Sequence, residues 1–232
     1  MIVLALDALD LRQVQRYNCV NLMQREYGET DITEFEMERT VVLWASFLTG
    51  KNMEKDIPIE GQWAFRLPVE ETFLKFFDKY KAIDMPALSY KEENHKRERG
   101  LLKGYFQDEA EIKEYDEVVW RNHEENKKEF FTTLGKFDLL IAYFNLADAI
   151  GHLSFGIPEK MEKVYIELDA IAKETRASVD DHVLIISDHG MKAVGRYGDH
   201  TKNGFYSTNK ELGLTLPRIT DFYKIIREKT CR

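Results

Sequence analysis

Three short runs of consecutive apolar residues interrupt a mostly polar pattern, and each of them ends at polar side chains. The runs are residues 2–6 (IVLAL), 137–145 (FDLLIAYFN) and 182–188 (HVLIISD). Continuous apolar character, as opposed to strict alternation, is typical of strands that are buried on both faces of a parallel sheet. The pattern therefore predicts three strands of a mostly parallel central sheet.

A helical pattern separates the last two of these runs. Residues 158–177 begin with Pro158, which suits the first turn of a helix, and then repeat apolar residues at helical spacing. Strand, helix and strand form a βαβ unit, so we expect an α/β fold built as an αβα sandwich, with ligands bound beyond the carboxyl ends of the strands. Asp7, Asp148 and Asp188 lie at or just past those ends.

The middle of the chain, residues 51–135, is dense in charge and differs from both ends. It predicts helices at 69–82 and 108–132 and contains no convincing central strand. The charged stretch 90–100 (YKEENHKRERG) predicts a solvated loop or helix face. We therefore expect a single domain over residues 1–232 with a small, mostly helical insertion or cap at about 51–135.

Two further expectations concern the chain end and the isolated histidines. Residues 219–232 predict a final helix, because their apolar side chains recur at helical spacing. His95, His123 and His182 stand in charged stretches or at a strand start. We expect these three histidines at the surface and assign them no role.

The acidic balance of the chain limits its partners. With 41 acidic against 33 basic residues the formal net charge is −8, which excludes a general electrostatic attraction to nucleic acids or anionic membranes. A phosphate-bearing ligand would need local positive charge, and bound metal ions are an obvious source of it. We expect a small-molecule partner and no stable nucleic-acid binding.

Cysteine usage and hydropathy bear on the compartment. Cys19 and Cys231 lie far apart in the sequence, and the N-terminus carries neither a basic leader nor a small-residue cleavage site. No apolar run approaches the ~20 residues that a membrane-spanning helix needs. These observations favour a soluble, cytoplasmic protein that does not associate with membranes. The oligomeric state does not follow from the sequence.

Aspartate and histidine gather in short motifs next to the predicted strand ends. They are DAIGH (148–152), SDHGM (187–191) and GDH (198–200), and Asp7 follows the first strand. Oxygen and nitrogen ligands without a thiolate suit two hard-to-borderline divalent ions, Zn²⁺ first and Mn²⁺ as the alternative. The set is too large for one ion.

The order of these motifs resembles the alkaline phosphatase superfamily, and most closely its type I phosphodiesterase/nucleotide pyrophosphatase branch. That branch has an Asp after the first strand, a Thr that opens a helix running into Thr-Gly, then D-x-x-G-H, D-H-G-M and a late His. This chain shows the same order in Asp7, the segment 40–50 (TVVLWASFLTG), the segment 148–152, the segment 188–191 and His200. The resemblance covers roughly residues 1–55 and 137–207 and leaves the middle without support.

The resemblance implies roles for individual residues. One metal would be held by Asp148, His152 and His200. The other would be held by Asp7, Asp188, His189 and the hydroxyl of Thr40. Thr40 would be the nucleophile, activated by a metal and placed at a helix N-terminus that favours phosphate. A phospho-threonine intermediate would then be hydrolysed by water.

Some residues depart from the pattern of this branch. A Pro and an Asn commonly follow the nucleophile, and Val42 and Leu43 stand there instead, so a donor to a phosphate oxygen is missing. Lys51 or Lys202 could substitute as substrate-binding residues. Ser46 and Thr49 are rival nucleophiles, but they lie inside the helix, away from its N-terminal amides.

The function predicted from these features is a metal-dependent hydrolysis of phosphodiester or pyrophosphate bonds in nucleotides or other small phosphate esters. A phosphomonoesterase or a cofactor-independent phosphomutase would use the same two-metal site and is the nearest alternative. A non-catalytic metal- or ligand-binding protein that keeps the fold is the alternative of another class.

Overall fold

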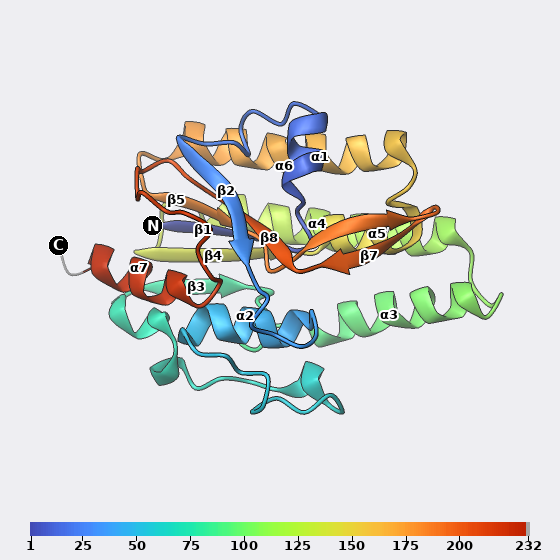
Figure 1. The fold of residues 1–232 in the computed structure, drawn as a ribbon, viewed down its shortest axis with the longest axis horizontal. Helices are drawn as coiled ribbons and strands as arrows, with labels where there is room; N and C mark the ends of the chain where they lie inside the picture. Colours follow the sequence, from blue (N-terminus) through green and yellow to red (C-terminus); the bar gives the residue numbers. More distant parts are fainter. Residues whose placement is uncertain (231–232) are drawn as a thin grey trace.

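The computed structural model describes residues 1–230, and its central feature is a six-stranded sheet (Figure 1). The strand order across the sheet is β2-β8-β5-β1-β4-β3. The strands are β1 (Ile2–Leu6), β2 (Glu26–Asp31), β3 (Tyr80–Ile83), β4 (Leu139–Phe144), β5 (Val183–Ile186) and β8 (Asn203–Thr208). The three predicted apolar runs thus form β1, β4 and β5, which are neighbours in the middle of the sheet.

The sheet is mostly parallel, as the sequence predicts. β1 pairs in parallel with β4 on one side and with β5 on the other, and β3 pairs in parallel with β4. Strand β8 runs antiparallel to β5, and β2 runs antiparallel to β8. Because β1, β4 and β5 point the same way, the residues that follow them meet at one edge of the sheet.

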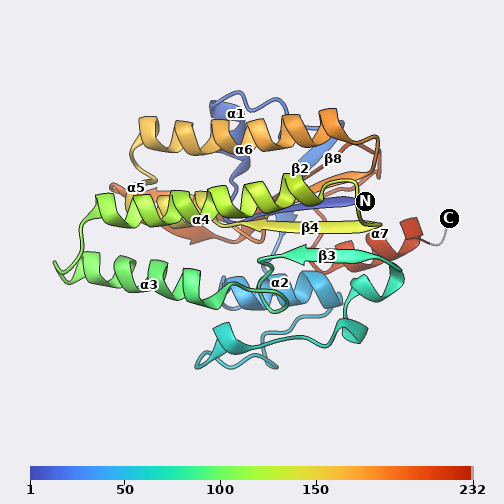
Figure 2. The ribbon, with the colours of Figure 1, turned by 180° about the vertical axis from the view of Figure 1, so that it is seen from behind.

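Helices cover both faces of the sheet (Figures 1 and 2). The helices α4, α5 and α6 lie on one face, and α2 and α7 lie on the other. The helices are α1 (Leu11–Arg16), α2 (Thr40–Thr49), α3 (Glu92–Phe106), α4 (Ile112–Thr133), α5 (Leu146–Ser154), α6 (Pro158–Ser178) and α7 (Asp221–Thr230). The predicted αβα sandwich is confirmed.

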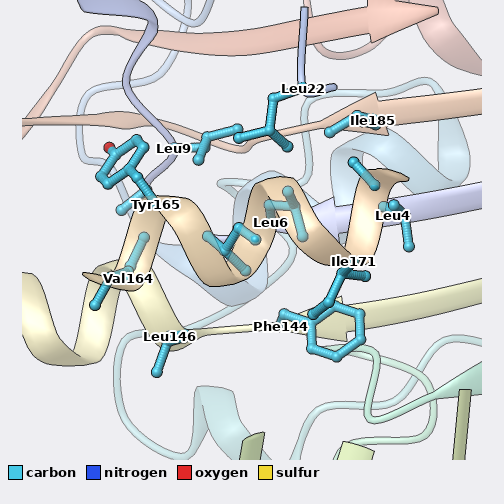
Figure 3. Packing of buried hydrophobic residues seen from close by; sticks show 14 of the residues in the cluster. Leu4, Leu6, Leu9, Leu22, Phe144, Leu146, Val164, Tyr165, Ile171 and Ile185 are labelled. Carbon is cyan, nitrogen blue, oxygen red and sulfur yellow. The ribbon is translucent and has the colours of Figure 1, made fainter. Parts of the chain in front are cut away.

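Strand β1 shows how the two layers are built. Ile2, Leu4 and Leu6 face the core under α4–α6, whereas Val3 and Ala5 face the core under α2, and all five side chains are at most 1% exposed. Figure 3 shows α6 lying across Leu4 and Leu6 on the first of these faces. A strand that is covered on both sides has to be apolar at every position, which is why its sequence shows no alternation.

Segment 69–82 is not the predicted helix. It contains two short 3₁₀ turns, Val69–Glu71 and Phe73–Phe76, and then the edge strand β3, which joins the central sheet. Of the four residues of β3 only Ile83 is buried, so this strand lacks the continuous apolar signal of the central ones. The second predicted helix of the middle segment, 108–132, corresponds to α4.

The charged stretch 90–100 forms the start of α3 and is not fully solvated. His95 and Glu98 are 3% and 4% exposed, and His123 of α4 is 2% exposed. The expected surface positions of His95 and His123 are therefore wrong, because carboxylate and amide partners on neighbouring elements bury them. His182 is partly exposed.

The remaining expectations concern the final helix, the cysteines and membrane-spanning segments. The final helix α7 begins at Asp221, and Cys231 with Arg232 lies outside the described residues. Cys19 is buried and unpaired in the described part of the chain, and burial raises the pKa of its thiol to about 12. None of the helices within residues 1–230 combines the length and the apolar character that crossing a membrane requires.

A glycine lets β8 pass close to the end of β5. A Cβ at Gly204 would overlap the carbonyl oxygen of Ser187 and would come within 2.7 Å of Thr30 Oγ1. Ser187 N donates to Phe205 O at 2.7 Å, so the two backbones are fixed against each other at this point. Ser187 immediately precedes the Asp188 motif, so this close approach helps to position that motif.

We predict that Gly204→Ala destabilises the protein by roughly 1–3 kcal/mol, because the buried backbone around Ser187 has to move. Gly100→Ala is the matched control, since Gly100 is an exposed residue of α3 with no atom within 4 Å of the added Cβ. The control should be neutral or stabilise the protein by up to about 1 kcal/mol, the helix preference of Ala over Gly. Urea denaturation measures both values, and equal midpoints for the two variants would contradict the close approach.

Candidate metal centre

Aspartate and histidine side chains converge at the carboxyl edge of the central sheet. Asp7 follows β1, and Asp188 with His189 follows β5. Helix α5, which follows β4, carries Asp148 and His152. His200 comes from a separate two-stranded hairpin of β6 (Gly190–Val194) and β7 (Tyr197–Thr201), where it pairs with Met191. The parallel strands and the hairpin together bring these six residues to one place.

One group of donors consists of Asp7, Asp188 and His189, and all three are at most 1% exposed. His189 Nε2 lies 3.3 Å from Asp7 Oδ1 and 3.5 Å from Asp188 Oδ2. These three atoms are buried and have no hydrogen-bond partner. Buried polar atoms normally find partners, so three unpartnered ones facing each other suit a cation as their shared partner.

The other atoms of this group are held by hydrogen bonds. His189 Nδ1 donates to the carbonyl oxygen of Gly190 at 3.1 Å, which leaves Nε2 free to act as a ligand. The hydroxyl of Tyr143 donates to Asp7 Oδ2. The amide of Ala8 donates to Asp188 Oδ1 at 3.4 Å, and Ala8 has a φ of 56°, a left-handed conformation that non-glycine residues seldom adopt. Tyr143 of β4 therefore orients the carboxylate of Asp7, and the turn after β1 orients that of Asp188.

A second group is centred on Asp148. Its Oδ1 lies 3.1 Å from His200 Nε2, and its Oδ2 lies 3.3 Å from His152 Nε2. His200 Nδ1 donates to the backbone carbonyl of Glu38 at 3.3 Å. The rings of His189 and His200 stack with centroids 3.8 Å apart, and Asp148, His189 and His200 can offer ligand atoms to one ion. His189 thus belongs to both candidate ligand groups, whereas His152 contacts the other carboxylate oxygen, Oδ2, of Asp148.

Burial shifts the pKa values of the first group in the direction of neutral side chains. Desolvation, followed by the charges of Asp188 and Asp148, raises the pKa of Asp7 well above its usual range. Desolvation is also the main cause that raises the pKa of Asp188 to about 7 and lowers that of His189 to about 4. A divalent cation would offset this desolvation cost, because its positive charge stabilises the ionised carboxylates.

In the second group, attraction between neighbouring side chains outweighs the desolvation that disfavours their charged forms. Burial opposes the charged form of Asp148, but His152 and His200 outweigh it and hold the pKa of this carboxyl well below its usual range. Burial likewise disfavours charge on His200, yet the hydrogen bond and charge of Asp148 raise its pKa to about 9. Asp148 also raises the pKa of His152. A metal ion bound at this group would have to displace the protons that Asp148 favours on these imidazoles.

The donor chemistry fits divalent metals. The residues offer carboxylate oxygens and imidazole nitrogens without a thiolate, which suits Zn²⁺ or Mn²⁺. The backbone carbonyls of Gly190 and Glu38 accept from the Nδ1 atoms of two histidines and leave their Nε2 atoms for coordination. The three unpartnered buried atoms lie within this set.

A cavity of about 290 Å³ opens beside these donors. Thr40, the first residue of α2, lines it together with Asp7, Asp148 and His200. The first amides of a helix have no partners within the helix, so the start of α2 suits an anionic group. Thr40 is partly buried and reaches the cavity, as a nucleophile would have to.

The rival hydroxyls are engaged elsewhere. Ser46 Oγ donates to Val42 O at 2.7 Å and accepts from Met53 N, and Thr49 Oγ1 donates to Ala45 O at 2.8 Å. Both side chains are at most 5% exposed, and neither lines the cavity.

The two candidate substrate-binding lysines do not reach the cavity. Lys51 is exposed beyond the far end of α2, ~15 Å along the helix axis from Thr40 at 1.5 Å per residue. Lys202 Nζ donates to the carbonyls of Phe35 and Glu36 and pairs with Glu38 at 2.9 Å. The ammonium group of Lys202 is thus engaged by Glu38 and two backbone carbonyls, and Lys51 is too distant from the cavity to contact a ligand there. The arginine and amide side chains on the cavity wall are instead Arg39, Arg99, Gln62 and Asn145.

The comparisons with known proteins agree with the fold. A family model described as type I phosphodiesterase/nucleotide pyrophosphatase matches residues 38–209, a range that contains the proposed site residues other than Asp7. No curated protein matches the chain. The alkaline phosphatase from the Antarctic bacterium TAB5 is similar in structure, with a TM-score of 0.56, 11% identity and coverage of 99% of this chain and 97% of that one. At this identity the likeness concerns the fold alone.

Two other solved structures show lower similarity. Murine ectonucleotide pyrophosphatase/phosphodiesterase 5 has a TM-score of 0.47 and 12% identity over 84% of this chain. Phosphonoacetate hydrolase from Sinorhizobium meliloti has a TM-score of 0.43 and 14% identity over 82% of it. The chain covers 58% of the murine protein and 56% of the bacterial one.

A buried polar network that the sequence analysis does not predict adjoins the cavity. His95 Nε2 contacts Asp84 Oδ2 at 2.9 Å, and His95 Nδ1 contacts Glu98 Oε2 at 3.0 Å. Glu98 also accepts from Asn145 Nδ2 at 2.8 Å and from Asn122 Nδ2 at 2.7 Å. Asn145 directly follows β4 and lines the cavity. The spacing His-x-x-Glu within α3 is the only local signal for this network, and it is common on exposed helices.

We predict a pH-dependent stability that comes from His95. Burial lowers its pKa, but the hydrogen bonds and charges of Asp84 and Glu98 outweigh burial and raise the pKa to about 9, from 6.5. A raised folded-state pKa stabilises the protein fully below pH 6.5, and this contribution is lost as the pH rises through about 9. His95→Gln should therefore destabilise the protein by about 3 kcal/mol at pH 6, and this difference should shrink as the pH rises from 6.5 to about 9 and be largely lost above pH 9.

Urea denaturation of both proteins over this pH range measures the difference. A destabilisation that stays constant with pH would show that His95 contributes packing and no charge.

Proposed function

The chain belongs to the type I phosphodiesterase/nucleotide pyrophosphatase family, and from that premise we propose that it is a two-metal hydrolase of phosphodiester or pyrophosphate bonds. Asp148, His152 and His200 would hold one metal ion. Asp7, Asp188, His189 and the Thr40 hydroxyl would hold the other. Zinc is the first expectation and manganese the second.

The observation that carries this proposal is the set of unpartnered buried atoms Asp7 Oδ1, Asp188 Oδ2 and His189 Nε2. A fold that needed only stability would gain by replacing these groups with apolar side chains. Their presence beside a cavity that Thr40 also lines supports a role in catalysis. When bound, the metal ions would supply Lewis acidity toward the phosphoryl group and its leaving oxygen.

The protein's own residues supply position and selectivity. Thr40 would attack phosphorus in line while the P–O bond to the departing alcohol or phosphate breaks, and water would then cleave the threonine–phosphorus ester, releasing the remaining phosphate monoester and restoring the hydroxyl. The first-turn amides of α2 would hold phosphoryl oxygens. Asn145, fixed by Glu98, places another hydrogen-bond donor on the wall of the same cavity, although the branch's usual Asn is absent from α2.

We predict that Thr40→Ala lowers kcat by at least ~1,000-fold, because the covalent route is lost. Thr49→Ala is the matched control in the same helix and should retain activity to within a few-fold. The assay uses bis-p-nitrophenyl phosphate and nucleotides with zinc- or manganese-loaded protein, and metal content is measured for each variant. Wild-type protein that cleaves none of these substrates with full metal occupancy would sink the proposal.

The same assay separates the nearest alternative. A phosphomonoesterase or phosphomutase would act on p-nitrophenyl phosphate or on sugar phosphates faster than on diesters. Turnover of Thr40→Ala equal to that of wild type would instead rule out the covalent role of this residue.

We predict that metal binding stabilises the fold. Zinc or manganese at 100 times its Kd should raise the free energy of unfolding by about 2.7 kcal/mol. Asp188→Asn should lower the bound metal measured by mass spectrometry and reduce this gain. Asp199→Asn is the matched control, because its exposed side chain pairs with Lys192 and lies beside His200 without joining the ligand groups. Equal metal content in both variants would contradict the assignment of Asp188.

A further inference from the structure

Part of the cavity wall comes from the middle of the chain, for which the family resemblance offers no residue roles. Trp63 of the 3₁₀ turn η1 (Gln62–Ala64), Tyr90 before α3 and Arg99 within α3 all line the cavity that Thr40 and the metal-site residues share. In Figure 2, α3 extends past the end of the sheet alongside α4. This segment therefore contributes side chains that can touch the part of a substrate away from the reacting phosphorus.

These three side chains contact one another. The guanidinium carbon of Arg99 lies 4.2 Å from the ring centroid of Trp63, and Arg99 Nη1 donates to the Tyr90 hydroxyl at 3.1 Å. The Trp63 and Tyr90 rings are stacked at 16° with centroids 5.6 Å apart. Tyr90 in turn stacks on His95, with centroids 4.2 Å apart and an interplanar angle of 3°. The rings therefore act mainly to hold the guanidinium in place.

Arg99 carries a positive charge that no carboxylate of residues 1–230 neutralises in an ion pair, although acidic residues outnumber basic ones. The nearby Glu98 is engaged by His95, Asn122 and Asn145. Arg39, the other cavity arginine, donates to the carbonyls of Ile57 and Glu54 and likewise forms no ion pair in the described chain. A partly buried, unpaired guanidinium on a cavity wall favours an anionic ligand.

The position of Arg99 is set in advance by the buried network under α3. His95, one helical turn before Arg99, is fixed by Asp84 and Glu98, and Asp84 also accepts from Lys91 N at 2.7 Å. A guanidinium that is fixed before binding loses little conformational freedom when the ligand arrives. The side chains of Trp63, Tyr90 and Arg99 are thus preorganised, and the positive charge of Arg99 is in place to bind an anion before the ligand arrives.

We propose that Arg99, held by Trp63 and Tyr90, forms a subsite for a second anionic phosphate group of the substrate, beyond the phosphoryl group that Thr40 attacks. This inference rests on the proposed function and specifies its substrate class: phosphate esters or anhydrides in which the departing part carries negative charge. The two rings already stack within the wall, so the subsite recognises charge in preference to a nucleobase. A guanidinium matches the geometry of phosphate oxygens through paired N–H donors.

Two substrates with the same nucleoside test the subsite. Thymidine 5′-triphosphate carries further phosphates, whereas the p-nitrophenyl ester of thymidine 5′-monophosphate has a leaving group without them. Arg99→Gln should lower kcat/KM for the triphosphate by roughly 10- to 100-fold, as expected for a lost charge-assisted hydrogen bond, and for the nitrophenyl ester by less than about 3-fold. Arg97→Gln, an exposed arginine of the same helix, is the matched control and should change neither value.

The possible outcomes separate the subsite from the reaction. Equal losses on both substrates, or no loss on either, would overturn the subsite while leaving the hydrolase proposal intact. Cleavage of neither substrate by wild type would overturn the proposed function, and calorimetry of thymidine triphosphate with metal-loaded protein then decides on the subsite. Binding at least about tenfold weaker in Arg99→Gln supports it, and equal binding overturns it. Equal denaturation midpoints for the variants verify that folding is unchanged.

Discussion

The burial of carboxylates at the carboxyl edge of the sheet is the constraint around which the rest of this structure is organised. Asp7 and Asp188 are almost completely shielded from water and lie close to Asp148, an arrangement that disfavours their ionised forms. Unpaired buried charge costs several kcal/mol for each ion. The hydrogen bonds from Tyr143 and Ala8 relieve only part of this cost. A bound cation would offset this cost, and the sheet has to be stable enough to keep these carboxylates buried.

The fold supplies that stability from both faces. The two apolar layers meet at β1, whose residues alternate between the core under α4–α6 and the core under α2. The same strand leads directly into Asp7, so a strand whose side chains are at most 1% exposed positions one of the candidate metal ligands.

The sequence predicts features that depend on local pattern and misses those that depend on distant partners. The central strands and the Asp and His motifs were visible because continuous apolar runs lead directly into them. Strand β3 was missed, because an edge strand of four residues with one buried side chain has no distinctive period. His95 and Arg99 were missed for another reason: Asp84, Glu98, Trp63 and Tyr90 give them their environment, and a charged helix looks the same whether it is solvated or packed.

Asp148 divides its two carboxylate oxygens between His152 of its own helix and His200 of the β6–β7 hairpin. The contact between Asp148 and His200 thus also attaches the two-stranded β6–β7 sheet to helix α5. An ion held there would bind residues of both parts. The free energy of ion binding would therefore also stabilise the attachment of the hairpin to the central sheet. A substitution that weakened ion binding to speed product release would then also weaken the attachment of the β6–β7 hairpin. The turnover rate and the local stability of the hairpin would therefore be coupled.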